Sequence, residues 1–386
     1  MDRPPHWPGL SGVRVLDLSR LLPGGFATLA LADLGADVIK VESPQGGDYG
    51  RQVDPDTFAA LNRNKRSVVL DLREAAGRDT LLRLVENSDA VVESYRPGVL
   101  AAMGLDYERL RTANPAVVLC SITGFGQSGP YAHRPGHDLN FLALSGFFAI
   151  PHRAEGLVDR IGLRVGDMAG SLYAALATTV AVLGARATGE GQHLDVSLHE
   201  AAAAWAAPLA LSSSALGTPA DSPLVTGDND VFVLSDGRRL TLATFEDKFW
   251  LNFRRCFAAD FPALADDTWD SRADRTRDKG AVRALLADVF ARRPLPWWSA
   301  RLSELDVPWA PVYESGTEFL QDPHVRARDL VGTLPGSVTE VPRAQVRFPV
   351  LFGAGLESLR RAAPSHGEHT TEVLAELDRP RSPRAT

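Results

Sequence analysis

Two residues of this sequence, His137 and Asp167, could act together as an acid/base pair. His137 lies in the stretch 135–140, Pro-Gly-His-Asp-Leu-Asn, and Asp167 lies in 165–170, Val-Gly-Asp-Met-Ala-Gly. A histidine and a carboxylate on opposite sides of a bound carbon acid could take a proton from one face and return one to the other. Each residue also has a structural interpretation, because an aspartate can cap a helix and a histidine can be a satisfied core residue.

The composition is close to the average of soluble globular proteins, with 45% hydrophobic and 23% charged residues. A chain of 386 residues exceeds the size at which single cores stop growing, which predicts two domains or one large domain with an appendage. The formal net charge of −7 argues against nucleic acid as the main partner. Cys120 and Cys256 lie far apart, so neither a disulfide scaffold nor a zinc site is indicated and a reducing cytoplasm fits best.

The sequence predicts neither export nor a membrane span. The N-terminal residues lack the apolar stretch of a secretory signal. Two uncharged runs, 168–185 and 201–220, are long enough to be considered as membrane spans. Both are rich in small residues rather than leucine and isoleucine, and Pro208 interrupts the second, so we predict buried helices.

The first two hundred residues alternate apolar strands with helices. Repeated strand-helix-strand units imply right-handed crossovers and a mostly parallel sheet that is covered on both faces. The predicted fold class is therefore α/β, with a doubly wound large domain. Strands are expected at 13–18, 37–41, 67–72, 90–93 and 116–122, and helices at 26–34, 74–87 and 107–114.

The rest of the chain changes character several times. Residues rich in Gly, Pro, Asp and Asn before residue 231 indicate a boundary, after which two short apolar strands predict a hairpin. The predicted domains are a first part of the large domain at 1–200, a linker helix and loop at 201–227, a small α+β domain at 228–315, and a return segment at 316–386 that completes the large domain. A strand at 345–348 and a helix at 370–377 are expected in the return segment.

Basic residues gather near the ends of the predicted strands. Doubly wound sheets bind ligands beyond the carboxyl ends of their strands. Cations there would suit a ligand with several phosphates, although a solvated surface is the alternative for any one of them. The cluster at 62–66 enters a strand rather than leaving one, so this argument does not place it. The residues concerned are Arg20, Lys40, Asn62, Arg63, Lys65, Arg66 and Arg96.

Sequence motifs for other cofactors are absent. Residues 124–129 match G-x-G-x-x-G, but Pro130 follows and no helix is expected there, so we reject a dinucleotide fingerprint. No Walker A sequence occurs, and the nine histidines form no metal-binding motif. We therefore expect neither NAD nor a metal.

Several stretches resemble the family III CoA-transferases, the CaiB/BaiF group that also contains α-methylacyl-CoA racemases and carnitine CoA-transferases. The resemblance implies a discontinuous Rossmann-like large domain, a small domain, and two chains threaded through one another as an interlocked homodimer. It also implies an acyl-CoA substrate, with CoA as the only cofactor, bound through Lys40, the 62–66 cluster, Arg96 and Arg20. The stretches are 10–18, 32–42, 61–67, 95–100, 123–130 and 325–328.

The resemblance gives Asp167 a catalytic role and leaves the reaction open. Asp167 matches the family's catalytic carboxylate, which in transferases attacks the thioester and carries covalent acyl and CoA intermediates. The stretch 136–146 resembles the racemase pattern, in which His137 is the second base and Glu246 resembles a supporting glutamate of the small domain. Residues 225–231 depart from that pattern, because racemases carry Gly-Gly-Ala-Pro-aromatic there.

Three hypotheses follow. The favoured one is a racemase or epimerase of 2-methylacyl-CoA thioesters, in which His137 and Asp167 exchange α-protons. Backbone N–H groups near Met168 and Ala169, where a helix begins, would stabilise the enolate. The alternative is a transferase that moves CoA between a thioester and a free carboxylic acid through Asp167, with His137 a bystander. The third is a CoA-binding protein without activity, suggested by the altered stretch 225–231.

Overall fold

A computed structural model describes residues 9–150, 161–211, 225–334, 343–355 and 357–378 of the chain. Contacts between residues divide the chain into two compact units. The first unit contains Met1–Phe147, Arg160–Ala206 and Pro323–Thr386, and the second contains Phe148–Asp159 and Ala207–Asp322. The first unit is therefore discontinuous in the sequence.

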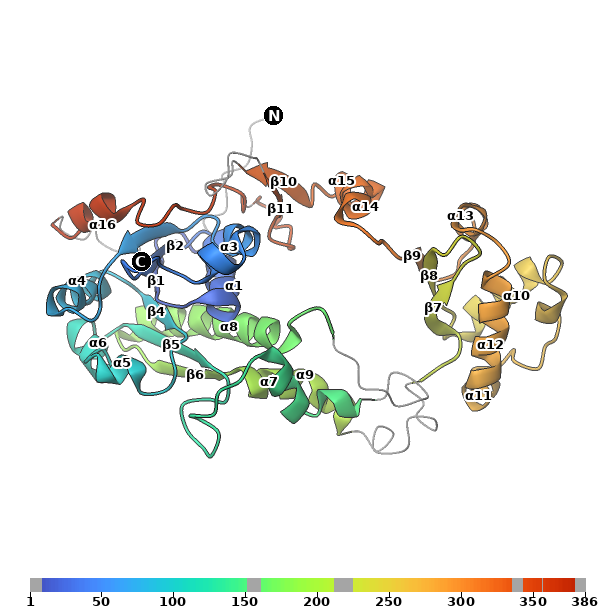
Figure 1. Ribbon diagram of the computed structural model, residues 1–386, viewed down its shortest axis with the longest axis horizontal. Coiled ribbons are helices and arrows are strands. Elements are labelled where there is room, and N and C mark those ends of the chain that lie inside the picture. Colours follow the sequence, from blue (N-terminus) through green and yellow to red (C-terminus); the bar gives the residue numbers. More distant parts are fainter. Residues whose placement is uncertain (1–8, 151–160, 212–224, 335–342, 356, 379–386) are drawn as a thin grey trace. The chain divides into compact units, whose positions relative to one another are not determined.

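The first unit is built on a six-stranded parallel sheet with the order β3-β2-β1-β4-β5-β6 (Figure 1). The order runs outward from β1 in both directions, as in a doubly wound Rossmann-like sheet. The predicted α/β fold class is confirmed. The strands are β1 (Arg14–Asp17), β2 (Asp37–Glu42), β3 (Arg66–Val69), β4 (Ala90–Glu93), β5 (Val118–Thr123) and β6 (His193–Ser197).

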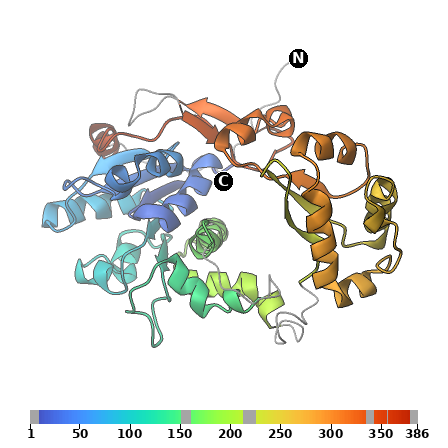
Figure 2. The ribbon, with the colours of Figure 1, turned by 45° about the vertical axis from the view of Figure 1, so that its right-hand side comes forward.

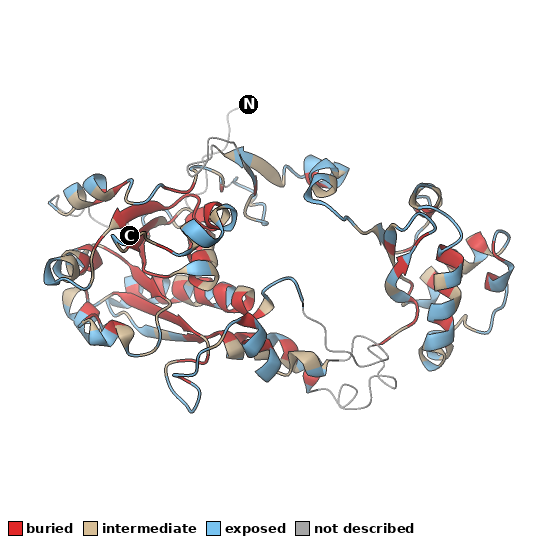
Figure 3. Ribbon diagram, viewed as in Figure 1, coloured by how far each residue is buried: buried red, intermediate tan, exposed pale blue. Residues whose placement is uncertain are grey.

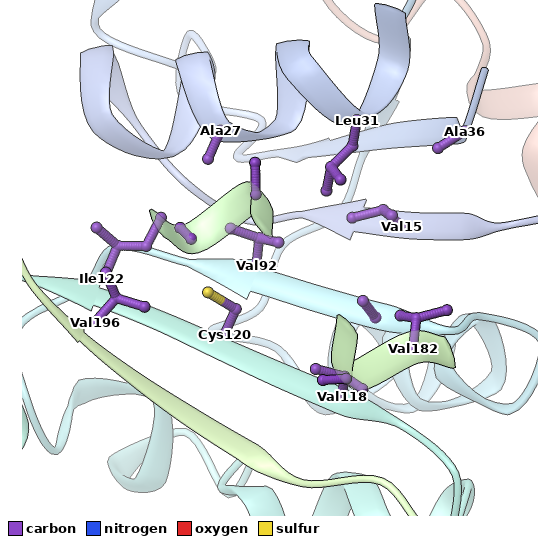
Figure 4. Packing of buried hydrophobic residues seen from close by; sticks show 14 of the residues in the cluster. Val15, Ala27, Leu31, Ala36, Val92, Val118, Cys120, Ile122, Val182 and Val196 are labelled. Atoms are coloured by element: carbon purple, nitrogen blue, oxygen red, sulfur yellow. The ribbon is translucent and has the colours of Figure 1, made fainter. Parts of the chain in front are cut away.

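Helices cover both faces of this sheet, and its central strands are buried (Figure 3). Successive strand residues point to opposite faces, so Val15 and Val92 join one apolar cluster (Figure 4) while Leu16 and Val91 join the other. The first face packs against α1 (Leu21–Asp33) and α8 (Val165–Thr188), and the second packs against α4 (Ala75–Glu86), α6 (Tyr107–Ala113) and α16 (Thr370–Glu376).

Helix α8 contains the first of the two uncharged runs. Among the described residues it alone is long and apolar enough, by length and composition, to cross a membrane, and 50% of its apolar window is buried. Its small residues Ala174 and Ala181 pack in the apolar cluster under the sheet. A core helix rich in apolar residues passes the same test of length and composition. The second run is described only in α9 (Leu198–Ala210) and at residue 211.

The second unit contains an antiparallel sheet of β7 (Asn229–Val233), β8 (Arg239–Ala243) and β9 (Trp309–Pro311). The hairpin expected after residue 231 is formed by β7 and β8. Aromatic side chains fill the core between this sheet and the helices, where Phe253, Phe290 and Trp298 are fully buried. Helix α12 (Lys279–Phe290) lies against β7 (Figure 2).

The stretch that departs from the racemase pattern, 225–231, has a structural role in the second unit. Asp228 is buried, and its carboxylate accepts a hydrogen bond from Arg275 Nε at 2.6 Å. Gly227 lies against α12 so closely that a Cβ atom would be 2.1 Å from the Lys279 carbonyl oxygen. Residues 227 and 228 therefore fasten the start of the hairpin to the helices of this unit.

The 62–66 cluster fastens the return segment to the first unit. Asn64 Nδ2 donates to the Ser358 carbonyl at 2.7 Å, and Asn64 Oδ1 accepts from the backbone N–H groups of Arg360 and Arg361 at 3.0 and 2.9 Å. The φ of Asn64 is 65°, a left-handed conformation that asparagine tolerates better than most residues. Arg66 pairs with Glu376 of α16 at 2.6 Å. These contacts attach residues 358–361 and α16 to the edge strand β3 and to the residues before it.

We expect Asn64→Asp to destabilise the fold by about 2–3 kcal/mol, because an acceptor would replace the amide that donates to Asp33 and to the Ser358 carbonyl. Hydrogen exchange of backbone amides in 357–378 should accelerate more than exchange in the central strands. Asn87→Asp, at the C-cap of α4, is the matched control. Unchanged exchange in 357–378 would contradict this role of Asn64.

Candidate active site

Asp167 is buried in the first turn of α8. One turn later in α8, Ser171 Oγ lies 2.7 Å from the carbonyl oxygen of Pro23 in α1 and 2.6 Å from that of Asp167. Helix α8 also packs against α1 and β5. The start of α8, which carries Asp167, is therefore attached to the first turn of α1, which follows β1.

A second carboxylate, Asp138, lies beside Asp167. Asp138 begins α7 (Asp138–Leu144), is 8% exposed, and accepts a hydrogen bond from the Asp167 backbone N–H at 3.0 Å. Burial raises the pKa of Asp167 to about 7; the negative charge of Asp138 adds to the rise and Arg164 opposes it. Asp167 therefore changes between its neutral and ionised forms near neutral pH.

The stretch around His137 contacts Asp167, but the contact is made by Asp138 and not by His137, the residue that we expected to act with Asp167. His137 is the exposed N-cap of α7, and its backbone N–H donates to Asn140 Oδ1 at 3.0 Å. Asp138, the next residue, makes the contact with Asp167. The sequence analysis assigned no role to Asp138. The only signal for it was an acidic residue directly before an apolar helical run.

The backbone donors expected to stabilise an enolate are already used within the fold. The Met168 N–H donates to the Arg164 carbonyl at 3.0 Å as part of α8, and the Asp167 N–H donates to Asp138. Ala169 is fully buried. The expectation that N–H groups near Met168 and Ala169 serve an enolate oxygen is therefore wrong for Met168.

Glu246 belongs to the second unit. It is the exposed N-cap of α10 (Asp247–Phe257). Its role as a support for His137 and Asp167, which lie in the first unit, stays a prediction.

A cavity opens beyond the carboxyl ends of β1 to β4, where doubly wound sheets bind their ligands. Arg20 lines it with its guanidinium 5.5 Å from the Tyr95 ring centroid and 5.8 Å from that of Tyr49. Among the described residues, no carboxylate forms a salt bridge with Arg20. Its positive charge is thus available to a ligand. The other lining residues include Ser19, Lys40, Glu42, Asp48, Asp71 and Arg73.

The two predicted lysines are buried in an ion cluster around Asp17. Lys65 Nζ lies 3.0 Å from Asp17 Oδ2, and Lys40 Nζ lies 2.9 Å from Asp48 Oδ2. Burial alone would raise the pKa of Asp17, but Lys40 and Lys65 hold it well below its usual value. Burial lowers the pKa of Lys65 to about 8, although Asp17 opposes the shift. Lys40 still borders the cavity, whereas Lys65 does not.

The remaining predicted CoA contacts lie in different surroundings. Arg63 is buried and pairs with Asp33, and Asn62 accepts a hydrogen bond from Lys65 at 2.9 Å. Arg66 pairs with Asp37 and α16, and Arg96 is exposed in the loop after β4. The structure therefore gives Asn62, Arg63, Lys65 and Arg66 partners within the chain. Contacts of these residues with CoA stay a prediction.

The sequence model of "CoA-transferase family III" matches residues 10–370 of this chain. The chain belongs to this family. It is 36% identical to a succinate–glutarate CoA-transferase of Agrobacterium fabrum over 98% of both chains, and 31% identical to a human succinyl-CoA:glutarate CoA-transferase over 95% of this chain and 86% of the human one. A crystal structure of a CaiB/BaiF family protein from Brucella suis superimposes with a TM-score of 0.85 and 31% identity, covering 97% of this chain and 100% of the other.

The resemblance to CoA-transferase family III predicted from the sequence is confirmed, and the protein is an enzyme. The names of the relatives support the transferase alternative rather than the favoured racemase hypothesis. An acyl-CoA substrate is consistent with the names of both relatives.

The burial of Asp167 predicts a pH-dependent cost to stability. The pKa of about 7 lies above that of an unfolded aspartate, so the folded state loses stability relative to the unfolded state as the pH rises through this interval. The free energy of unfolding of Asp167→Asn, minus that of the wild type, should grow by about 2–4 kcal/mol between about pH 4 and pH 8. Urea titrations would measure it.

Asp106→Asn is the control for this prediction, because Asp106 lies at a helix start, as Asp167 does, but is exposed; its carboxylate accepts the Arg109 N–H at 2.9 Å. Its stability difference should change far less with pH. A difference for Asp167→Asn that stays constant from pH 4 to pH 8 would show that Asp167 ionises as freely as an exposed aspartate, contrary to the structure.

Proposed function

We propose that this enzyme transfers CoA from a dicarboxylic acyl-CoA, such as succinyl-CoA, to a second dicarboxylic acid, with glutarate the first acceptor to test. The observation that supports this proposal most directly is the buried Asp167 beside Asp138, in a chain that belongs to CoA-transferase family III. The choice of acids rests on the names of the bacterial and human relatives. The transferase needs neither a metal nor a redox cofactor.

Asp167 would act as the nucleophile of a double displacement. Its carboxylate attacks the thioester carbonyl carbon, the C–S bond breaks, and a mixed anhydride and a CoA thiolate result. The thiolate attacks the aspartyl carbonyl, which releases the donor acid as a carboxylate and leaves CoA on Asp167. The acceptor carboxylate attacks the aspartyl-CoA thioester, which releases the thiolate and forms a second anhydride. The thiolate then attacks the acyl carbon of the acceptor. The new acyl-CoA leaves and the Asp167 carboxylate is restored.

The pKa of Asp167 suits this role. A carboxylate with a pKa of about 7 is more basic than an exposed one and is still largely ionised just above neutral pH. The reaction also makes no use of an α-proton, so it does not require the Met168 N–H that α8 already occupies. His137 is then a bystander at the surface of α7.

The cavity next to Arg20 is the proposed site of the CoA nucleotide. Arg20 brings a positive charge that no salt bridge with a described carboxylate neutralises, and the neighbouring Tyr95 ring offers an aromatic face. Arg20 directly precedes α1, and in the first turn of this helix the Pro23 carbonyl accepts a hydrogen bond from Ser171, one turn beyond Asp167. A ligand that binds at Arg20 would therefore lie next to the helix turn that contacts α8, the helix of the nucleophile.

One assay separates the transferase from the racemase. Purified enzyme is mixed with succinyl-CoA and glutarate, and glutaryl-CoA is measured by chromatography. A 2-methylacyl-CoA is incubated in deuterated buffer in parallel. We expect glutaryl-CoA formation in the wild type and in His137→Ala, a loss of at least about 1,000-fold in Asp167→Ala, and no deuterium at the α-carbon. Deuterium exchange that disappears in His137→Ala, without CoA transfer, would refute the proposal.

We also propose that the enzyme is a homodimer, as the family resemblance implies. One face of α8 presents Leu176, Val180 and Leu183 at 62, 60 and 62% exposure, although other residues of the helix, such as Ala174 and Ala181, are core. Apolar side chains in such a row mark an interaction surface.

Light scattering should give about twice the mass of one chain, and Leu176→Glu should shift the measured mass toward that of a single chain. Val53→Glu, on an exposed residue of α2 (Gly50–Val53), is the control; a monomeric wild type would refute the dimer.

A further inference from the structure

The helix that carries Asp138 is closely packed through Phe141. The Phe141 ring, one turn later in α7, packs edge-on against Phe125 with the ring centroids 5.2 Å apart. Cβ atoms at Gly124 and Gly136 would come within 2.6 and 2.7 Å of this ring. Gly124 begins the G-x-G-x-x-G stretch, which we do not expect to bind a dinucleotide. Its glycine instead makes room for Phe141 and so fixes the helix that carries Asp138.

The contact between Asp138 and the first turn of α8 is equally close. A Cβ atom at Gly166 would lie 3.2 Å from Asp138 Oδ1, the same oxygen that accepts the Asp167 N–H. The start of α7 and this N–H both stabilise negative charge on Asp138. Asp138 thus places its carboxylate against the backbone of Asp167, and both residues are buried.

We propose that Asp138 is a positioning residue for the Asp167 nucleophile: it fixes the Asp167 backbone and places a second negative charge against the carboxylate that becomes acylated. This inference rests on the proposed transferase function. When Asp167 attacks a thioester, its negative charge passes to the departing thiolate and the anhydride on Asp167 is neutral. The aspartyl-CoA thioester is neutral as well. Repulsion between the two carboxylates is therefore present before each attack by Asp167 and relieved after it.

The charges that act on Asp167 come from a small set of groups. Asp138 and Arg164 act on it directly and in opposite directions. Of the elements packed against α8, α1 carries Asp33, which pairs with Arg63, and β6 carries Asp195, which accepts from the Gln127 N–H. The further titratable groups on or next to α7, β5, β6 and α9 are His137, Cys120, His193, His199 and Glu200. None of these contributes to the shift in the pKa of Asp167.

A double-mutant cycle over pH tests the pairing without any activity assay. Asp138→Asn keeps an oxygen that can accept the Asp167 N–H but removes the charge. The gain in stability of Asp167→Asn between about pH 4 and pH 8 should therefore be smaller in the Asp138→Asn background than in the wild type. An equal gain in both backgrounds would overturn the proposal. Asp106→Asn replaces Asp138→Asn in the control cycle and should leave the gain unchanged.

The pH profile of CoA transfer tests the consequence for catalysis. The acidic limb of kcat/KM for succinyl-CoA should move down by about one pH unit in Asp138→Asn, and kcat on the plateau should fall about tenfold. Asp138→Ala also removes the acceptor of the Asp167 N–H and should lose about tenfold more. A merely structural Asp138 would leave the limb in place, which would overturn the proposal.

The two tests fail in different ways. A wild type that transfers CoA, together with an unchanged limb and an unchanged cycle in Asp138→Asn, refutes the role of Asp138 alone. A wild type that transfers no CoA, together with the expected cycle, refutes the transferase function and with it the catalytic part of this proposal. The electrostatic pairing of the two carboxylates would then stand by itself.

Discussion

The first unit depends on the ion cluster around Asp17. Its carboxylate, fully buried at the end of β1, lies 3.0 Å from Lys65 Nζ and accepts a hydrogen bond from Ser19 Oγ at 2.5 Å. Removing one member would strand an uncompensated charge in the interior, at a cost of about 3–5 kcal/mol. Because the members come from the ends or starts of β1, β2 and β3, the cluster fixes these strand ends relative to one another. It also sets the course of the loop after β1.

That loop and the first turn of α1 connect the two halves of the proposed site. Arg20, the last residue of the loop, faces the cavity, and the strained Leu21, with a φ of 60°, donates its N–H to Asp48, the partner of Lys40. A few residues later the Pro23 carbonyl meets Ser171 of α8. A non-glycine residue in this conformation persists only where its surroundings hold it there. The ion cluster thereby stabilises both the cavity proposed for CoA and the helix of the proposed nucleophile.

The sequence predicted the fold well, because alternating apolar strands and helices dictate a doubly wound sheet whatever the side-chain details. The motif around Asp167 is local, so the sequence could single this residue out as the candidate nucleophile. The sequence did not show which partner each charged residue has. An arginine such as Arg66 looks the same in the sequence whether it binds a phosphate or pairs with Glu376, which lies 310 positions away. Asp138 was missed for the same reason, since its contact with Asp167 spans 29 positions and only folding brings the two carboxylates together.

The central claim is that Asp167 itself exchanges oxygen with the substrates. An acceptor carboxylate that attacks CoA-bound Asp167 leaves one of its oxygens on the aspartate when the thiolate cleaves the anhydride. The direct measurement is peptide mass spectrometry after turnover of succinyl-CoA with glutarate labelled with ¹⁸O in its carboxylates. We predict ¹⁸O in the Asp167 carboxylate and in no other side chain. An unlabelled Asp167 after many turnovers, with glutaryl-CoA formed, would contradict the account.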